Sequence, residues 1–319
     1  MRDRYNREIN YLRISVTDRC NLRCIYCMPE NESSSVPIEE MLTFDEIEAI
    51  VKQAVKLGIT RVKLTGGEPL VRKGIPELVK ILHSIDGIEQ VTMTTNGILL
   101  EQYIDELVIN GLDAINISID SLDPVKYHQV TRIGNLEDAL RGLNAAIKSG
   151  ITVKVNVVLY PGDDWKQMIM LAKDKPVCVR FIETMPIGMG EKYSGVFKED
   201  IISFFEEQGI ILNEDEDNHG NGPAKYFKPE GYEGSIGIIA PIHGKFCDSC
   251  NRIRMSATGM IKPCLCYKER YDIRKYVREG TAEDIFETLK MAILAKPDAH
   301  MFSKREYVTE TQYMYGIGG

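Results

Sequence analysis

Three cysteines lie close together near the start of this 319-residue chain, at Cys20, Cys24 and Cys27. They directly follow residues 11–16, an apolar run that is typical of a β-strand. A structural zinc site is closed by four protein ligands, and a [4Fe–4S] cluster likewise has four metal corners to be held. Three thiolates in one short loop therefore predict a cluster with one open iron. The alternative is a structural zinc ion that takes its fourth ligand from elsewhere in the chain.

A second cysteine group lies near the C-terminus and has the spacing Cys-x2-Cys-x13-Cys-x-Cys. Its members are Cys247, Cys250, Cys264 and Cys266. This spacing alone suits a four-thiolate zinc site and an iron–sulfur cluster equally well. In a reducing compartment, clustered cysteines indicate metal or redox sites rather than disulfides.

Strands and helices alternate through the first part of the chain and would position the first cysteine loop. Besides the strand before that loop, apolar and β-branched runs predict strands at residues 59–65, 90–95, 114–119, 153–160 and 177–182. Amphipathic segments between them predict helices, one of them over residues 99–110, so the sheet should be parallel with helices outside. Right-handed crossovers would curl six such units into a partial, six-stranded βα barrel, an α/β fold. A flat, doubly wound sheet is the alternative.

The strand ends carry polar and glycine-rich signatures. After successive strands come residues 66–69 (Gly-Gly-Glu-Pro), 94–97, 118–121 and 183–186. In βα barrels the catalytic face is formed at the carboxyl ends of the strands. The first cysteine loop follows a strand as well, so we expect it on the same face.

The alternation stops after Gly190, which predicts two regions. Residues 1–190 would form the partial barrel, and residues 191–319 would form an extension with the second cysteine group. A hairpin is expected in the extension from the short apolar runs at residues 225–227 and 235–240.

The composition indicates an ordinary globular protein, with 44% hydrophobic and 27% charged residues. We find no apolar run long enough to span a membrane and no secretory leader, so we predict a cytoplasmic protein that binds no membrane. The net charge of −8 argues against general nucleic-acid binding. An anionic substrate would need a local set of basic residues.

The first cysteine loop, with Tyr26 before the third cysteine, resembles that of the radical S-adenosylmethionine (radical SAM) superfamily. The Gly-Gly-Glu-Pro sequence at residues 66–69 matches the glycine-rich strand end of that superfamily. The resemblance implies that the first trio holds a [4Fe–4S] cluster whose open iron binds S-adenosylmethionine. It also implies contacts to that cofactor from Tyr26, Gly67, Ser118 and Met185.

Three further segments resemble the GTP 3′,8-cyclase family within that superfamily. They are residues 12–21, residues 246–254 (Phe-Cys-Asp-Ser-Cys-Asn-Arg-Ile-Arg) and the terminal pair Gly318-Gly319. The resemblance implies a second [4Fe–4S] cluster on Cys247, Cys250 and Cys264, with its open iron toward the guanine of GTP. Cys266 would be a spare thiol, and the competing assignment makes it the fourth ligand.

The resemblance also assigns roles to basic and glycine residues. Catalytic roles would fall to Arg13, Arg252, Arg254, Gly318 and Gly319. Contacts to GTP would come from Arg13, Lys63, Thr94, Lys154, Arg252 and Arg254. The two lysines each interrupt an apolar strand, which suits residues that face an anion inside a barrel. A further phosphate contact from Arg132 is a hypothesis.

The implied reaction converts GTP to (8S)-3′,8-cyclo-7,8-dihydroguanosine 5′-triphosphate, the first step of molybdenum cofactor biosynthesis. It needs an external electron donor, and its product would pass to cyclic pyranopterin monophosphate synthase. A homodimer is possible. The alternatives are a two-cluster radical SAM enzyme acting on a peptide, and a metal- or redox-sensing protein with zinc at the second cysteine group.

Overall fold

A single curved β-sheet organises the computed structural model, which describes residues 1–319 except 32–34, 162–164, 194, 216, 218 and 319. In the described residues the sheet has 12 strands in the order β12-β11-β10-β1-β2-β3-β4-β5-β6-β9-β8-β7. The strands are β1 (Tyr11–Ser15), β2 (Arg61–Thr65), β3 (Gln90–Thr95), β4 (Ala114–Ser118), β5 (Thr152–Leu159), β6 (Cys178–Glu183), β7 (Leu212–Glu214), β8 (Lys225–Pro229), β9 (Ser235–Ile239), β10 (Arg252–Met255), β11 (Met260–Lys262) and β12 (Tyr271–Asp272).

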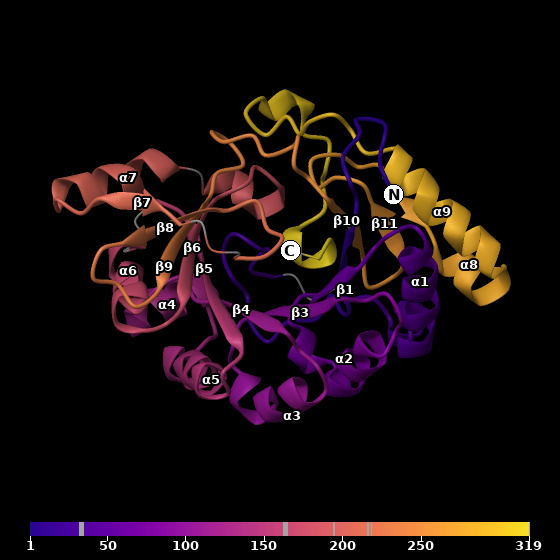
Figure 1. The fold of residues 1–319 in the computed structure, drawn as a ribbon, viewed down its shortest axis with the longest axis horizontal. Coiled ribbons are helices and arrows are strands. Elements are labelled where there is room, and N and C mark those ends of the chain that lie inside the picture. The colour runs from indigo at the N-terminus through magenta and orange to yellow at the C-terminus, as the bar shows by residue number, and fades with distance from the viewer. Residues whose placement is uncertain (32–34, 162–164, 194, 216, 218, 319) are drawn as a thin grey trace.

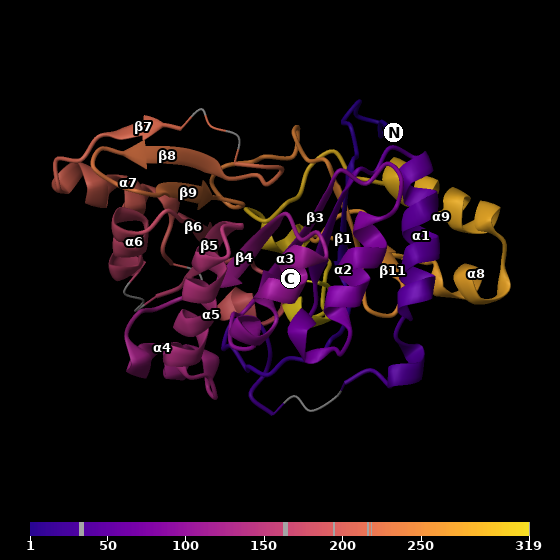
Figure 2. The ribbon, with the colours of Figure 1, turned by 60° about the horizontal axis from the view of Figure 1, so that its bottom comes forward.

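Helices cover the outer, convex side of the sheet (Figures 1 and 2). They are α1 (Phe44–Lys56), α2 (Ile75–His83), α3 (Ile104–Ile109), α4 (Pro124–Thr131), α5 (Leu136–Lys148), α6 (Trp165–Asp174), α7 (Lys198–Glu207), α8 (Arg274–Glu279) and α9 (Ala282–Leu294). The apolar side chains of the strands and helices form one continuous core. The predicted parallel arrangement is confirmed, because β1 to β6 pair in chain order and all in parallel.

The prediction of a six-stranded sheet is wrong, since strands of the C-terminal region extend the sheet at both ends. β10 pairs in parallel with β1, and β9 pairs in parallel with β6. Antiparallel pairs then add β11 and β12 on one side and β8 and β7 on the other. These additions satisfy backbone groups that β1 and β6 would otherwise expose as sheet edges. The expected hairpin is confirmed as β8 and β9, but the second of its strands also joins the main sheet.

Two helical predictions also need correction. The segment expected as one helix over residues 99–110 forms a 3-10 turn, η3 (Leu100–Gln102), followed by α3, because the chain leaves Gly97 through a tight turn (Leu100 N to Gly97 O, 3.1 Å). Helix α4 was not predicted. Its signal was present, since Asp123 caps the N-terminus through Val125 N–H and a proline occupies the first turn.

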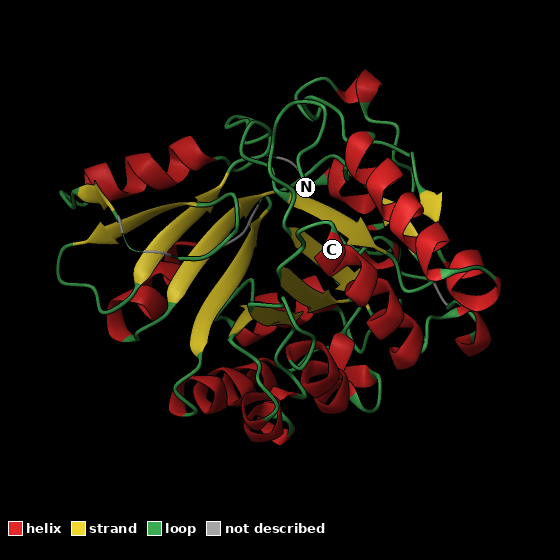
Figure 3. Ribbon diagram, turned by 45° about the vertical axis from the view of Figure 1, so that its right-hand side comes forward, coloured by secondary structure: helices red, strands yellow, loops and turns green. Residues whose placement is uncertain are grey.

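The two cysteine groups lie at opposite ends of one parallel strand pair. Cys20 follows the carboxyl end of β1, whereas Cys250 precedes the amino end of β10, and these strands run in parallel with Arg13 opposite Arg254. The last residues of the chain enter the concave side of the sheet, where the C-terminus lies near the centre of the molecule (Figures 1 and 3).

Candidate active site

One cavity on the concave side of the sheet is lined by cysteines from both groups. Its lining includes Cys20, Cys24, Cys27, Cys247, Cys250 and Cys264. Residues from the carboxyl ends of the strands, such as Thr95, and from their amino ends, such as Gln90, also line it. The cavity therefore extends from one cysteine trio to the other along the length of the strands.

The first cysteine loop is a compact turn whose three cysteines are half-buried at the wall of the cavity. Cys20 Sγ accepts a hydrogen bond from Leu22 N at 3.3 Å, and Cys27 Sγ accepts one from the backbone N–H of Tyr315. Burial raises the pKa of Cys20 to about 11 and that of Cys27 to about 12. Three half-buried thiols with raised pKa values need a cationic partner to become thiolates, and a bound metal cluster supplies one. The donor set thus fits an iron–sulfur cluster held by three ligands.

Arg132 braces this loop from outside the cavity. Its guanidinium donates to the carbonyl oxygens of Arg23 (2.8 Å) and Met28 (3.0 Å), which lie on either side of the last two cysteines. Its own backbone is strained, with φ of +64°. Arg132 is not among the cavity-lining residues, so the hypothesis that it contacts phosphate is not supported.

Gly67 lines the cavity, and close packing explains why a glycine stands at this position. A Cβ at this position would lie 2.3 Å from the carbonyl oxygen of Arg19, so the glycine lets β2 approach the cysteine loop. Gly67 N also donates to Thr17 O at 2.7 Å. The first trio is therefore packed directly against the carboxyl end of β2.

The other residues expected near S-adenosylmethionine lie around the first trio. Ser118, Met185 and Tyr26 all line the cavity. The Tyr26 hydroxyl donates to Asp120 Oδ2 at 2.6 Å, and burial raises the pKa of that carboxyl group to about 6. The structure brings these residues to the same end of the cavity as Cys24.

In the second cysteine group, three thiols face the cavity and one does not. Cys247 Sγ accepts a hydrogen bond from His300 N at 3.3 Å, and Cys250 Sγ lies 3.6 Å from Lys296 Nζ. Cys266 does not line the cavity and instead packs with Ile187, Leu265, Phe302 and Ile317. The geometry favours Cys247, Cys250 and Cys264 as the three ligands of a cluster.

Cations crowd the middle of the cavity. All the arginines and lysines predicted to contact GTP line it, together with Thr94: they are Arg13, Lys63, Lys154, Arg252 and Arg254. Burial, and then the neighbouring charges of Arg180, Arg13 and other cations, hold the pKa of Lys63 well below its usual value. Burial and the charges of Arg13 and Arg252 lower the pKa of Arg254 to about 9. Mutually repelling cations at a cavity wall indicate a site for a multiply charged anion.

Several cavity residues were not predicted from the sequence. Arg180 on β6 faces the cavity and donates to Asn156 Oδ1 through Nε (3.0 Å) and Nη2 (2.5 Å). It interrupts an apolar strand as Lys63 and Lys154 do, so the same signal could have found it. Lys296 and His300 carry no comparable signal, because their contacts depend on how distant segments pack.

The predicted C-terminal glycine pair is placed only in part. Gly318 has φ of +77°, and its carbonyl oxygen accepts a hydrogen bond from Thr65 Oγ1 at 3.4 Å. A Cβ there would lie 3.2 Å from both Ser15 Cβ and Thr65 Oγ1, so the tail fits closely at the ends of β1 and β2. Gly319 lies outside the described residues, and Tyr315, rather than Gly318, lines the cavity.

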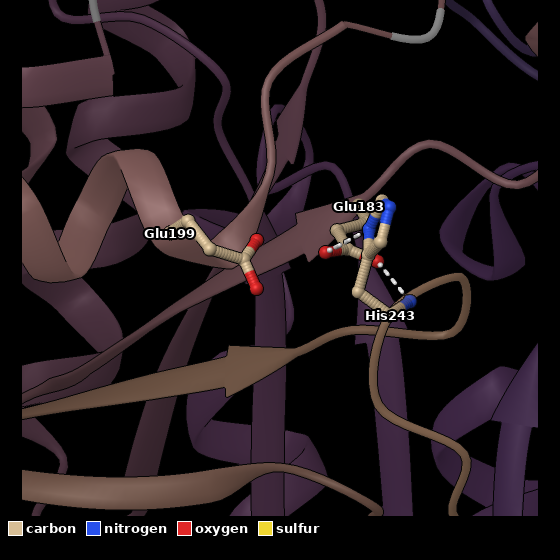
Figure 4. A group of neighbouring side chains, drawn as sticks. All are labelled: Glu183, Glu199 and His243. Atoms are coloured by element: carbon tan, nitrogen blue, oxygen red, sulfur yellow. Dashed lines mark hydrogen bonds and ion pairs between the residues drawn. The ribbon is translucent and has the colours of Figure 1, made fainter.

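A group of three potential metal ligands, Glu183, Glu199 and His243, lies where β6 ends (Figure 4). Both carboxylate oxygens of Glu183 already accept hydrogen bonds: Oε1 from Lys198 N (3.2 Å) and Oε2 from Ile242 N (3.0 Å). Glu183 therefore fastens the C-terminal region to β6, and we assign no metal to this group.

Residues 14–174 match the Radical SAM superfamily, and residues 177–302 match the family described as Molybdenum Cofactor Synthesis C. The chain is 41% identical over 323 residues to the GTP 3′,8-cyclase of Clostridium perfringens (strain 13 / Type A), with all of both chains covered. It is 44% identical over 326 residues, again with full coverage, to the GTP 3′,8-cyclase of Alkaliphilus oremlandii (strain OhILAs). The chain belongs to the GTP 3′,8-cyclase family.

Solved structures outside the GTP 3′,8-cyclase family share this radical SAM fold. Streptococcus suis SuiB bound to the precursor peptide SuiA aligns with a TM-score of 0.63 and 13% identity, covering 96% of this chain and 75% of SuiB. The enzyme anSMEcpe with bound AdoMet aligns with a TM-score of 0.57 and 16% identity, covering 96% of this chain and 93% of that chain. At such identities the likeness concerns the α/β fold alone. Within the described residues, no helix is both long and apolar enough to cross a membrane.

Proposed function

We propose that this chain is a radical SAM enzyme that converts GTP to (8S)-3′,8-cyclo-7,8-dihydroguanosine 5′-triphosphate, the first step of molybdenum cofactor biosynthesis. The observation that carries this proposal is a single cavity with a cysteine trio at each end and cations between them. A nucleoside triphosphate suits that arrangement, because its phosphates match the cations and its base can reach one trio.

Each cysteine trio would hold one [4Fe–4S] cluster with an open iron. Cys20, Cys24 and Cys27 would hold the first, and Cys247, Cys250 and Cys264 the second, while Cys266 stays in the apolar core. When bound, the first cluster and S-adenosylmethionine supply a carbon radical that abstracts a hydrogen atom from the substrate.

The protein's own residues bind and orient the two small molecules. Tyr26, Gly67, Ser118 and Met185 surround the S-adenosylmethionine site, although Gly67 acts by letting the loop pack. Arg13, Lys63, Thr94, Lys154, Arg252 and Arg254 bind GTP, and Arg180 joins them. Guanidinium forks on phosphate oxygens fix the triphosphate in one orientation. Gly318 and Gly319 have catalytic roles in this proposal, and the placement of Gly318 against Ser15 and Thr65, at the ends of β1 and β2, supports it.

The finer organisation follows the same reasoning. Strands β1 to β6 act as the partial barrel in residues 1–190, and residues 191–319 close it and carry the second cluster. The enzyme works in the cytoplasm with an external electron donor and passes its product to cyclic pyranopterin monophosphate synthase. It could do so as a homodimer.

An anaerobic assay tests this function directly. The reconstituted protein is incubated with dithionite, S-adenosylmethionine and GTP, and we expect 5′-deoxyadenosine together with the cyclised guanosine triphosphate. About eight irons per chain are expected, four for each cluster. Zinc with about four irons would favour a metal-sensing protein, and cleavage of S-adenosylmethionine without a guanosine product would point to another substrate.

A further inference from the structure

A single segment after α9, residues 296–301, donates hydrogen bonds to the sulfurs of the second cysteine group. Lys296 Nζ lies 3.6 Å from Cys250 Sγ, and His300 N donates to Cys247 Sγ at 3.3 Å. Met301 N donates to Cys266 Sγ at 3.3 Å. The two backbone donors are neutral, so among these three donors Lys296 is the one that carries a charge.

The Lys296 ammonium group is held in place by the segments that carry the cysteines. It donates to the carbonyl oxygens of Arg252 (2.7 Å), two residues after Cys250, and Pro263 (3.0 Å), one residue before Cys264. With the contact to Cys250 Sγ, all three N–H donors of the ammonium group have partners. One side chain thus ties together the backbone on which two of the three predicted ligands depend.

Burying the charge of Lys296 costs folding free energy unless an anionic partner compensates it. Only 4% of the Lys296 surface is exposed, and no carboxylate is among its hydrogen-bond partners in the described residues. Neighbouring Arg7 and Arg252 add positive charge rather than compensate it. A cluster held by three thiolates carries negative charge, and gains more when it is reduced. We therefore identify the metal centre as the anionic partner that stabilises the buried ammonium group.

We propose that Lys296 positions the second cysteine trio and raises the reduction potential of the cluster it holds. This inference rests on the proposed function, since it requires a cluster at the second trio. Fixed positive charge and N–H donors close to the ligand sulfurs favour the reduced, more negative state of an iron–sulfur cluster. Lys296 acts through Cys250 and Cys264, so it is a positioning residue.

The test compares Lys296→Met with a matched variant of the same helix region, Lys290→Met. Lys290 lies on the solvent side of α9 and pairs with Glu287 at 2.8 Å. Each variant is made in the full-length protein with all its cysteines. Each is also made in a full-length protein that carries Cys20→Ala, Cys24→Ala and Cys27→Ala, so that signals from the second cluster are measured without the first. The readouts are its midpoint potential, followed by electron paramagnetic resonance, and the rate at which a chelator removes its iron.

We expect Lys296→Met to shift the midpoint to a more negative potential and to speed iron loss by about tenfold or more. Lys290→Met should change neither. Lys296→Arg, which keeps the charge, should restore most of the potential, and it serves as the test if Lys296→Met does not fold. An unchanged potential in a folded Lys296→Met protein would overturn the inference and leave Lys296 as a purely structural tie. If the parent chain binds no iron at the second trio, the proposed function itself fails, which is a separate result.

Discussion

Lys154 extends from β5 into the cavity, where its ammonium group donates to the carbonyl oxygen of His219 and lies 5.9 Å from the centroid of the Tyr226 ring. Burial, with a further contribution from the charge of Arg180, lowers the pKa of Lys154 to about 8. This lysine therefore loses its charge within the pH range in which the enzyme can be assayed. Its contribution to anion binding should be lost over the same range.

We expect GTP binding to weaken as the pH rises from 7 to 9. A charged Lys154 attracts the triphosphate and a neutral one does not, so binding is favoured below the pKa and lost above it. The dissociation constant should rise by up to about tenfold for each unit by which GTP raises the lysine pKa. Equilibrium binding at pH 7, 8 and 9 measures this. Lys154→Arg should flatten the dependence, and a curve identical to that of the parent protein would contradict the assignment.

Lys63 should favour GTP binding but lower the stability of the nucleotide-free protein. Its pKa is held well below the usual value, so in the nucleotide-free fold this side chain opposes folding, most strongly at low pH and less as the pH rises toward the pKa of the unfolded chain. We expect Lys63→Met to raise the free energy of unfolding by about 1–3 kcal/mol near pH 7 without nucleotide. The stabilisation that GTP gives the parent protein should shrink in the variant.

Thermal unfolding with and without GTP checks this second prediction. Lys80→Met, at an exposed position on α2, is the control and should leave both values nearly unchanged. A Lys63→Met protein that is less stable than the parent without nucleotide would show that the lysine is compensated within the fold.

At the level of elements, α4 and the turn after it form a support for the first cysteine loop. Backbone hydrogen bonds join Arg23 N to Thr131 O (3.0 Å) and Ile25 N to Val130 O (2.9 Å), and the Arg132 side chain adds two more. The strained backbone of Arg132 is held by backbone hydrogen bonds around it, among them Arg132 N to His128 O at 2.7 Å.

Two substitutions of Arg132 should therefore have the same effect on retention of the first cluster but different effects on stability. Arg132→Gly removes the brace and relieves the strain, whereas Arg132→Ala removes the brace and keeps the strain. We expect both variants to lose first-cluster iron to a chelator faster than the parent, while Arg132→Gly is the more stable of the two by about 1 kcal/mol. Iron release and thermal unfolding measure the two effects. Retention of iron at the parent rate in both variants would remove Arg132 from any role in the loop.

The sequence predicts β1 to β6 because each is a run of β-branched and apolar residues that lies buried beneath helices. It does not predict β10, where Arg252 and Arg254 face the cavity and leave only Ile253 and Met255 as an apolar signal. The cysteine trios are predicted by their spacing. Their meeting in one cavity is not, since it depends on the parallel pairing of β1 with a strand some 240 residues away.

For the whole molecule, a buried ion pair anchors the C-terminal tail that enters the concave side of the sheet. The Glu310 carboxylate pairs with Lys262 of β11 and with Arg270 at 3.5 Å, and it also accepts the backbone N–H groups of Thr311 (2.9 Å) and Gln312 (2.8 Å). These contacts turn the chain toward the cavity a few residues before Tyr315.

We expect Glu310→Gln to cost about 3–5 kcal/mol of stability, because it leaves the buried Lys262 without its charge partner. The tail should then become open to chymotrypsin at its tyrosines, as limited proteolysis with mass spectrometry would detect. Glu287→Gln, which breaks an exposed pair with Lys290, should cost less than about 1 kcal/mol. The double change Lys262→Met with Glu310→Leu should recover much of the loss, and no recovery would show that other contacts hold the tail.

The parallel pairing of β1 and β10 also sets the distance between the two cysteine trios. The two trios lie beyond opposite ends of strands of only four or five residues, and each residue adds about 3.3 Å. The distance between the clusters is thus set by backbone geometry rather than by loops. Lengthening a strand by one residue would turn Arg13 to the opposite face, so the gap can grow only in two-residue steps of about 7 Å. A relative that acts on a longer substrate between two such centres must therefore differ in strand length, and point substitutions in the lining could not produce it.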